Sequence, residues 1–211
     1  TSVALAINDA GQVVGWSETA DGSIHAFRFT PGDGPDPMAG AAMQDLGTLG
    51  GAFSVGMTLN EAGDTAGFSD TAEGLERPFR YTDADGLRDL GAYVANPGRT
   101  DATPAHTRAL AISPDGRMVA GSARTPDGRE RAILWTEQTG VIDLNTLLPE
   151  GSAWRLASAD AFEADGVLLG RGLLNGEQRA FRLELEEQLG TADRDGDGRV
   201  DTAELTAFID G

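Results

Sequence analysis

The residues whose types and spacing most clearly imply chemistry lie in the stretch DRDGDGRVDTAE at 193–204. Asp193, Asp195 and Asp197 stand at every second position, and Glu204 closes the stretch at its twelfth position. Carboxylates at positions 1, 3 and 5, with a bidentate glutamate at position 12, are the oxygen donors that surround Ca2+ in a twelve-residue loop. The whole pattern is met without a mismatch, so the sequence predicts a calcium site.

The other loop positions are also filled as calcium binding requires. Gly198 stands where the loop turns sharply, and Arg199 at position 7 offers its backbone carbonyl. Asp201 at position 9 coordinates the ion directly or through water. The predicted calcium ligands are Asp193, Asp195, Asp197, Arg199, Asp201 and Glu204.

This loop resembles the EF-hand. It is also similar to dockerin loops, but those usually end in aspartate and occur in two copies. The following residues, LTAFID, read as a helix with Leu205, Phe208 and Ile209 on one face. We therefore expect an EF-hand-like loop and helix in a tail at 186–211. A single loop argues against a calcium-regulated switch, because sensors of this type usually pair their loops.

The chain offers few other catalytic or metal-binding groups. It contains no cysteine, which excludes disulfides, thiolate zinc sites and cysteine nucleophiles. Its only histidines, His25 and His106, assemble into no convincing Ser-His-Asp set, and nothing singles out one catalytic pair among 34 acidic residues. We predict that the protein is not an enzyme.

The charge balance restricts the class of partner. The formal net charge of -18 disfavours binding to nucleic acid or to an anionic membrane surface. No apolar run approaches the roughly 18 residues of a membrane-spanning helix, so no transmembrane segment is expected. The chain begins at Thr1, and we expect a processed start from which any signal peptide has been removed.

An internal repeat must position all of these groups. A turn glycine recurs at intervals of 52, 53 and 50 residues, as Gly11, Gly63, Gly116 and Gly166. A second turn recurs at intervals of 52, 54 and 48 residues, as Asp21-Gly22, Glu73-Gly74, Asp127-Gly128 and Asn175-Gly176. Because two independent landmarks keep one period, the sequence predicts four copies of a single unit.

Each copy reads as a meander of antiparallel strands. In copy one, turn signals separate VALAI, QVVGWSE, HAFRFT and MQDLG, and the Asp-Gly pair predicts a hairpin with positive φ at both central residues. Copy four stops after RAFRLEL and lacks the fourth strand. We expect a similar meander in every complete copy.

Four-stranded meanders at this period are typical of propeller blades. The predicted fold is therefore all-β, a propeller-like array of about four four-stranded antiparallel blades over 1–185. The repeats cover approximately 3–51, 52–102, 103–151 and 152–185. A closed four-bladed ring, an open arc completed by a second copy or another protein, and a fragment of a longer ring are all compatible with this count.

The stretches AINDAGQVVGWS, HAFRFT and MQDLGTLGG resemble the HAF repeat, a bacterial repeat named for the His-Ala-Phe in the second stretch. The resemblance covers roughly residues 1–185 and is weakest in copy four. It implies a β-rich repeat domain and export to the periplasm, the cell surface or the medium. It implies no established reaction.

The recurring positions are interpreted as scaffold. Arg77, Arg131 and Arg179 stand where copy one has His25, and an arginine cannot replace a general base or a metal ligand. The expected roles of two further recurring groups are cross-strand ion pairs, between Arg28, Arg80 and Arg182 and the acids Asp45, Asp89 and Asp143. A substrate-binding ring of arginines is the functional alternative.

Four strand aromatics could stack on sugar rings, although strand aromatics more often pack in a core; they are Trp16, Phe68, Trp135 and Trp154. We predict a non-catalytic, exported, calcium-binding interaction or accessory protein of a cell-envelope or extracellular assembly, with a protein as its partner. The alternative is a carbohydrate-binding or polysaccharide-cleaving propeller, with a glycan as ligand.

Overall fold

The computed structural model describes residues 1–34, 36, 38–94, 106–163, 166–185 and 207–210. The described chain forms sixteen β-strands and one short 3-10 helix, which confirms the all-β prediction. Among the described residues, no helix has the length and apolar character needed to cross a bilayer.

The strands fall into four antiparallel meanders, which we call units 1 to 4. Unit 1 contains β1 (Ser2–Ile7), β2 (Val13–Glu18), β3 (Ile24–Thr30) and β4 (Ala42–Gly47). Unit 2 contains β5 (Gly50–Leu59), β6 (Thr65–Thr71), β7 (Glu76–Thr82) and β8 (Gly86–Asp89). Unit 3 contains β9 (His106–Ile112), β10 (Met118–Arg124), β11 (Glu130–Thr136) and β12 (Gly140–Asp143), followed by the 3-10 helix Leu144–Leu147. Unit 4 contains β13 (Trp154–Phe162), β14 (Val167–Leu174), β15 (Glu177–Leu185) and β16 (Ala207–Asp210).

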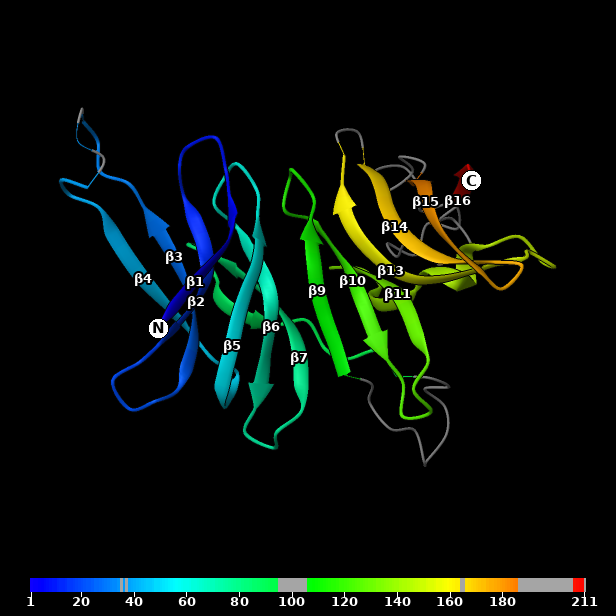
Figure 1. Cartoon of the computed structure of the whole chain (residues 1–211), viewed down its shortest axis with the longest axis horizontal. Coiled ribbons are helices and arrows are strands. Elements are labelled where there is room, and N and C mark those ends of the chain that lie inside the picture. The colour runs from blue at the N-terminus through cyan, green and yellow to red at the C-terminus, as the bar shows by residue number, and fades with distance from the viewer. Residues whose placement is uncertain (35, 37, 95–105, 164–165, 186–206, 211) are drawn as a thin grey trace.

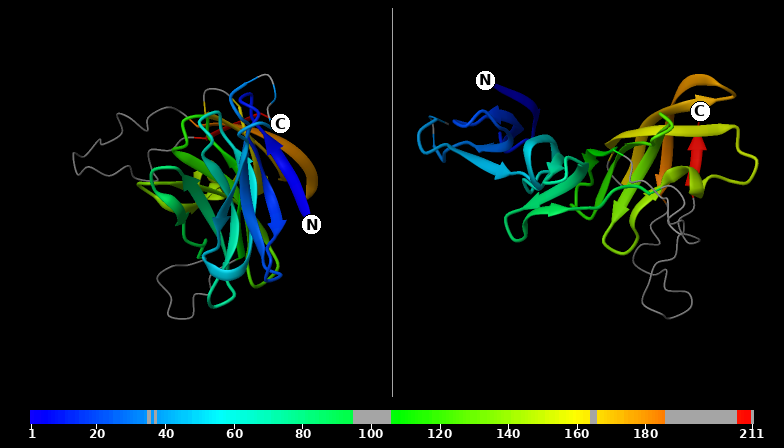
Figure 2. Two further views of the ribbon diagram at one scale, coloured as in Figure 1. Left: turned by 90° about the vertical axis from the view of Figure 1, so that its left-hand side faces the viewer. Right: turned by 90° about the horizontal axis from the view of Figure 1, so that it is seen from below.

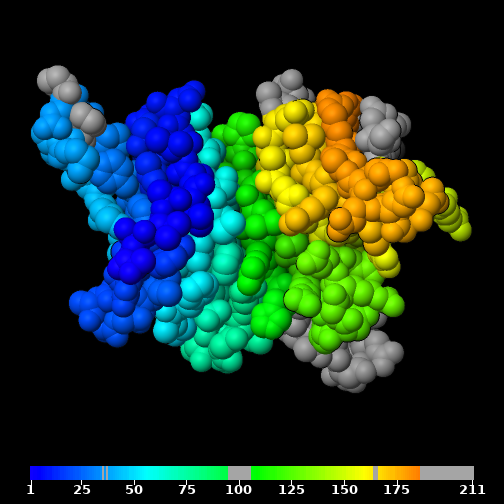
Figure 3. Space-filling model, in the orientation of Figure 1, coloured from blue at the N-terminus to red at the C-terminus, as the bar shows by residue number. Residues whose placement is uncertain are grey.

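The units follow one another in an open row, with units 1 and 4 at opposite ends (Figures 1 and 2). Among the described strands, only those of units 1 and 2 share a sheet, through a single parallel pairing of Ile24 with Phe53. The described strands form no closed ring, so the closed four-bladed ring, one of the three geometries that the repeat count left open, is not what the described residues form. The expected four-stranded units are present, but they stack as a linear array (Figure 3).

The turn glycines have the backbone conformation that the repeat predicts, although most hairpins differ in detail. In unit 1 the amide of Thr19 donates to the carbonyl of Ser23 at 2.8 Å, and Gly22 has φ of 87°. This is a three-residue loop closed by a glycine in the left-handed region, and units 2 and 3 repeat it. Only Asn175 (φ 52°) and Gly176 form the expected turn with positive φ at both positions.

A second glycine in each unit allows strands one and two to approach closely. A Cβ built on Gly15 or Gly67 would lie 1.9 Å from a carbonyl oxygen of the neighbouring first strand, that of Val3 or Val55. The first strand bulges at this point in both units. The equivalent glycines, Gly121 and Gly170, have the same close contact.

The apolar core lies between units. Register places Phe27 and Phe29 on one face of unit 1, and Ala26 and Arg28 on the other. We call the face containing Phe27, Phe79, Ile133 or Phe181 the N-face of its unit, and the opposite face the C-face. Each C-face packs on the N-face of the next unit.

Buried clusters mark these junctions. At the junction of units 1 and 2, Ala26 and Leu46 pack against Phe79 and Tyr81. At the junction of units 3 and 4 a larger cluster includes Leu134 of unit 3. One unit alone cannot cover both of its faces, so stacking supplies the core.

Unit 4 differs from the prediction at its end. Ala207–Asp210 forms β16, which pairs antiparallel with β15, from Leu185 with Ala207 to Arg182 with Asp210. The expected helix is therefore wrong over these residues, and copy four does not lack a fourth strand. The free edge of β15 offers backbone partners, and this tertiary pairing outweighs a short helical spacing of apolar residues.

Candidate functional site

The predicted calcium ligands lie outside the described residues, so their coordination stays a prediction. The six ligands all fall within 186–206, between β15 and β16. Leu185 and Ala207, which flank this segment, are paired residues of one ladder. Among the described residues, no cluster of His, Cys, Asp or Glu could hold a metal ion.

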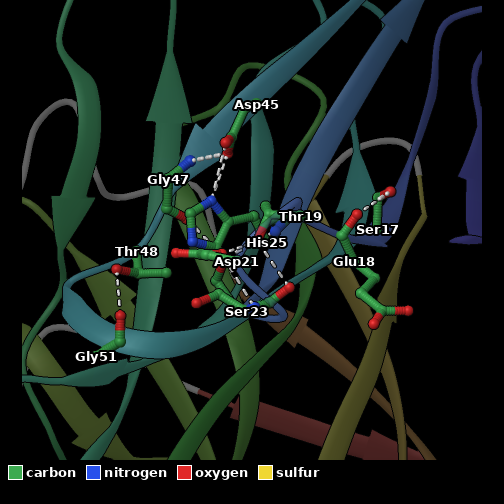
Figure 4. A network of polar contacts seen from close by, with 12 residues as sticks. Ser17, Glu18, Thr19, Asp21, Ser23, His25, Asp45, Gly47, Thr48 and Gly51 are labelled. Atoms are coloured by element: carbon green, nitrogen blue, oxygen red, sulfur yellow. Dashed lines mark hydrogen bonds and ion pairs between the residues drawn. The ribbon is translucent and has the colours of Figure 1, made fainter. Parts of the chain in front are cut away.

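His25 belongs to a polar network on the N-face of unit 1 (Figure 4). Its Nδ1 lies 2.9 Å from Oδ2 of Asp45, and Oδ1 of Asp45 accepts a hydrogen bond from the amide of Gly47 at 2.8 Å. In unit 3, Arg131 Nε lies 3.8 Å from the equivalent Asp143. The recurring partner of these aspartates is thus the residue at the histidine position, which supports the scaffold interpretation.

The arginine that follows the aromatic residue makes a different contact from the one predicted. Arg28 does not pair with Asp45: its Nη1 donates to the carbonyl of Gly63 in unit 2 at 2.9 Å. Its Nη2 lies 2.5 Å from Asp83, and its Cζ lies 5.5 Å from the ring centroid of Tyr81. The predicted intra-unit ion pair is wrong for Arg28, because this side chain points across the junction.

Arg80 repeats this arrangement one period later. Its Nη1 donates to the carbonyl of Gly116 in unit 3 at 2.9 Å, and its Cζ lies 5.5 Å from the ring centroid of Trp135. At the third junction Leu134 replaces the arginine, and Leu183 takes the aromatic position within one buried cluster. Arg28 and Arg80 therefore join units, which argues against a substrate-binding ring of arginines at these positions.

Asparagines in the first turn of a unit form a second ladder across the junctions. Asn8 Nδ2 donates to the carbonyl of Asn60 at 3.0 Å, and Asn60 Nδ2 donates to the carbonyl of Pro114 at 3.3 Å. Both side chains are buried, so these bonds replace lost hydration. The turn signal in the sequence identified these positions, but not their partners in the next unit.

The strand aromatics are used for packing. Phe68 is buried beneath Arg108, whose Cζ lies 4.5 Å from the ring centroid, and Trp135 is also buried. Trp154 packs edge-on against Phe181 with ring centroids 6.3 Å apart, and Trp16 is half-buried. These contacts favour the structural interpretation over stacking on sugar rings.

Sequence reasoning missed an arginine-lined hollow at the side of units 3 and 4. This open hollow has a volume of about 590 Å³ and is lined by Arg129, Arg155, Arg171 and Arg179 together with Glu130. All basic residues of the chain are arginines, and four of the 16 gather here despite a net charge of -18. They are far apart in the sequence, so only the folded arrangement brings them together.

The hollow has the chemistry of a weak anion site. Its arginines make exposed ion pairs within their own units: Arg171 with Asp160 at 3.5 Å, and Arg179 with Glu177 at 2.6 Å. Exposed pairs of this kind contribute little free energy, so an incoming carboxylate, sulfate or phosphate can replace them.

The comparisons with known proteins add no family assignment. No protein-family model matches the chain, and no curated protein matches it significantly.

Proposed function

We propose that this protein is a non-catalytic, exported, calcium-binding interaction protein, acting as an accessory subunit or surface component of a cell-envelope or extracellular assembly. The observation that carries the proposal is an open array whose first unit exposes an apolar face. The recurring arginines Arg28 and Arg80 and the turn asparagines Asn8 and Asn60, by contrast, are engaged in joining units.

The exposed face is the N-face of unit 1 with its first strand. Ile7 is 68% exposed, whereas Ile112, at the same position of unit 3, is 6% exposed because unit 2 covers it. Met43, which pairs with Phe29, is a further exposed apolar side chain of this face, and Leu5 is exposed at the bulge of β1. Concentrated apolar surface of this kind is typical of a protein–protein contact.

The interaction proposal is tested with variants of this face. Ile7→Asp places a charge on it, and Leu75→Asp places one at another exposed apolar position, in the second hairpin of unit 2. The tagged protein, returned to its native source and isolated again, should retain a stoichiometric protein partner that Ile7→Asp loses and Leu75→Asp keeps. Equal recovery with both variants would exclude this face.

The calcium part of the proposal rests on the complete donor pattern at 193–204. The paired residues Leu185 and Ala207 hold the two ends of the segment at neighbouring positions, which reduces the entropy lost when a loop closes around an ion. Calcium that binds only the folded loop should therefore stabilise the β15–β16 pairing. The loop would act as a structural clip without an EF-hand helix at 207–210.

Calorimetry tests the calcium site. The wild-type protein should bind one Ca2+, and Glu204→Gln or Asp193→Ala should weaken binding at least tenfold because each removes a charged ligand. Glu150→Gln, an exposed acid outside the loop, is the matched control. No heat of binding at millimolar calcium, or equal affinity in all four proteins, would rule the site out.

A second candidate function is binding of an acidic glycan, favoured by the arginine-lined hollow. Exposed arginines can pair with the carboxylates or sulfates of such a polymer. Oligogalacturonate should bind with an affinity that falls with salt and falls further in Arg155→Ala with Arg179→Ala. Arg117→Ala removes an exposed arginine of unit 3 outside the hollow and should leave the affinity for oligogalacturonate unchanged. Equal binding by the double variant would remove this candidate.

A further inference from the structure

The arginine-lined hollow has two walls, the second hairpin of unit 3 and the strands β13, β14 and β15 of unit 4. Three of its four arginines have an acid partner within their own unit: Arg129 with Asp127 at 3.2 Å, Arg171 with Asp160 at 3.5 Å, and Arg179 with Glu177 at 2.6 Å. These pairs balance most of the charge around the hollow. The groups that remain unpaired should therefore select the ligand.

The two unpaired charges of the lining are Arg155 and Glu130, and both residues are exposed. In the part of the chain that the structure describes, no hydrogen bond or ion pair engages either side chain. The two side chains line the same hollow, yet they do not pair with each other. The hollow thus offers a ligand one charged donor from unit 4 and one charged acceptor from unit 3.

Arg155 belongs to a row of three residues that crosses unit 4. The strand register places Arg155 opposite Leu173, and Leu173 opposite Gln178, so all three lie on one face of the sheet. All three line the hollow. Opposite residues of neighbouring strands are about 5 Å apart, so the row spans about 10 Å. A guanidinium, an apolar side chain and an amide are thus held at a fixed spacing by three paired strands.

This row matches the groups that an acidic sugar presents. A guanidinium can pair with a carboxylate through two parallel hydrogen bonds. Leu173 in the middle of the row can cover the C–H groups of a sugar ring, and the amide of Gln178 can both donate to and accept from a hydroxyl. A ring that carries a carboxylate on one side and hydroxyls on the other therefore satisfies all three residues.

Glu130 restricts the class of acidic ligand further. An ionised carboxylate only accepts hydrogen bonds, so it favours ligand hydroxyls on the wall opposite Arg155. It repels a ligand on which sulfate or phosphate groups replace these hydroxyls. The hollow as a whole favours a sugar carboxylate over a sulfated or phosphorylated sugar.

The size of the hollow indicates an oligomer. Its volume of about 590 Å³ is larger than one sugar residue, and the hollow is open to the surface. A chain of sugar residues can therefore pass through it, with neighbouring residues occupying the rest of the space. A single sugar acid would fill it only in part.

We infer that the hollow binds a uronate residue within a polyuronate chain, with its carboxylate on Arg155, its ring over Leu173 and its hydroxyls on Glu130 and Gln178. This inference rests on the second candidate function, the binding of an acidic glycan, and names the carboxylate-bearing class within it. Arg155 and Glu130 are the residues that determine specificity.

The test is an NMR titration of the full-length, isotope-labelled protein in calcium-free buffer, because calcium itself bridges polyuronate chains. The probes are trigalacturonate, its methyl ester, monomeric galacturonate and a sulfated galactose oligosaccharide. Trigalacturonate should bind and shift the amide signals of Arg155 and Leu173. The other three probes should bind at least ~10-fold more weakly, because each lacks the carboxylate, the neighbouring sugar residues or the hydroxyls that the hollow contacts.

Two variants test the assigned roles. Arg155→Ala should weaken trigalacturonate binding at least ~10-fold, and Arg155→Lys should restore only part of the loss, because an ammonium cannot form the two parallel hydrogen bonds. Glu130→Gln should lower the ratio of the affinities for trigalacturonate and the sulfated oligosaccharide at least ~5-fold, since it removes the repulsion of sulfate. Both residues are exposed, so folding should survive, and the NMR spectrum checks it. Arg117→Ala is the control and should bind like the wild type.

The outcomes separate this inference from the candidate function on which it rests. Equal binding of the sulfated oligosaccharide, lost in Arg155→Ala, would overturn the uronate assignment and leave acidic-glycan binding intact. Equal binding of the methyl ester or of monomeric galacturonate would overturn the carboxylate contact or the polymer, respectively. Binding of none of the acidic probes would remove both the inference and the candidate function. A Glu130→Gln protein with an unchanged affinity ratio would remove Glu130 from the site.

Discussion

Arg28 and Tyr81 belong to different units, and the guanidinium carbon of one lies 5.5 Å from the ring centroid of the other. Arg80 and Trp135 repeat this relationship at 5.5 Å one period later. The repetition shows that the arginine after the aromatic residue of the repeat serves contacts between units. The contribution of such a pair to stability can be measured by mutating both partners at the second junction.

The second junction should show coupling between its two partners. Arg80→Leu leaves the carbonyl of Gly116 without its donor and should lower the free energy of unfolding by about 1–3 kcal/mol. Combined with Trp135→Leu, the loss should be smaller than the sum of the single losses by about 0.5–1 kcal/mol, because the cation–π contact is counted twice. Urea denaturation of the four proteins measures this, and strict additivity would contradict it.

The close approach at the second strand should tolerate no side chain. Gly67→Ala places a Cβ 1.9 Å from the carbonyl oxygen of Val55, so strands β5 and β6 must separate. We expect a loss of at least ~3 kcal/mol, or failure to fold. Gly74→Ala is the control: it has φ of 75° but nothing within 4 Å, and should cost about 1–2 kcal/mol. Thermal unfolding measures the stability of both variants. Similar losses of stability in Gly67→Ala and Gly74→Ala would argue against the steric explanation.

The histidine of the HAF motif should be replaceable. His25→Arg keeps a donor for Asp45, as Arg131 does for Asp143, and should change the free energy of unfolding by less than ~1 kcal/mol. Asp45→Ala should cost more, since it also removes the acceptor of the Gly47 amide. Equilibrium unfolding in urea measures both. A His25→Arg protein that is more damaged than Asp45→Ala would restore a special role for the histidine.

The repeat, the strand content and the turn glycines could be predicted because they depend on local sequence. Gly11, Gly63 and Gly116 lie in left-handed turns, as the period indicated. The contacts of Arg28 and Arg80 could not be predicted, because their partners lie about 35 residues away in the next unit and depend on how units stack. A pairing rule between neighbouring strands was the wrong physical model for these side chains.

Two other features depended on long-range arrangement. The fourth strand of unit 4, AFID, is separated from β15 by 21 residues, and these four residues fit a helix as well as a strand. The arginine-lined hollow gathers residues from two hairpins and two units, so no spacing in the sequence reveals it. Closure was also beyond the sequence, because four meanders of this length can stack in a row or in a ring.

Asp70 should make the protein less stable at neutral pH than an uncharged residue would. Burial, followed by the nearby Glu76, raises the pKa of Asp70 above its usual value. A carboxyl whose pKa is raised by folding is penalised in its charged form, and the penalty is full above the folded-state pKa and disappears below the unfolded one. Asp70→Asn should therefore stabilise the protein at about pH 7, and the difference should shrink towards about pH 3.

Asp21→Asn is the matched control with the opposite sign. A hydrogen bond from Thr19 lowers the pKa of Asp21, so its charged form favours folding above the unfolded pKa and this benefit is lost as the pH falls through the folded one. Urea unfolding at about pH 7 and about pH 3 measures the free energy of unfolding of both variants. At about pH 7 it should be higher than that of the wild type for Asp70→Asn and no higher for Asp21→Asn. A destabilised Asp70→Asn protein would refute the assignment.

The exchange of Arg–aromatic for Leu–Leu at the third junction has a consequence for how the array could gain or lose units during evolution. Loss of unit 2 would bring Arg28 against Trp135, a pair of the same kind as Arg80 and Trp135, so units 1 and 3 could form a cation–π contact like the existing ones. Loss of unit 3 would bring Arg80 against Leu183, a cation against an aliphatic side chain in a buried position. The units are therefore not interchangeable. Recombination that removes unit 2 leaves a compatible junction, whereas recombination that removes unit 3 leaves a destabilising one.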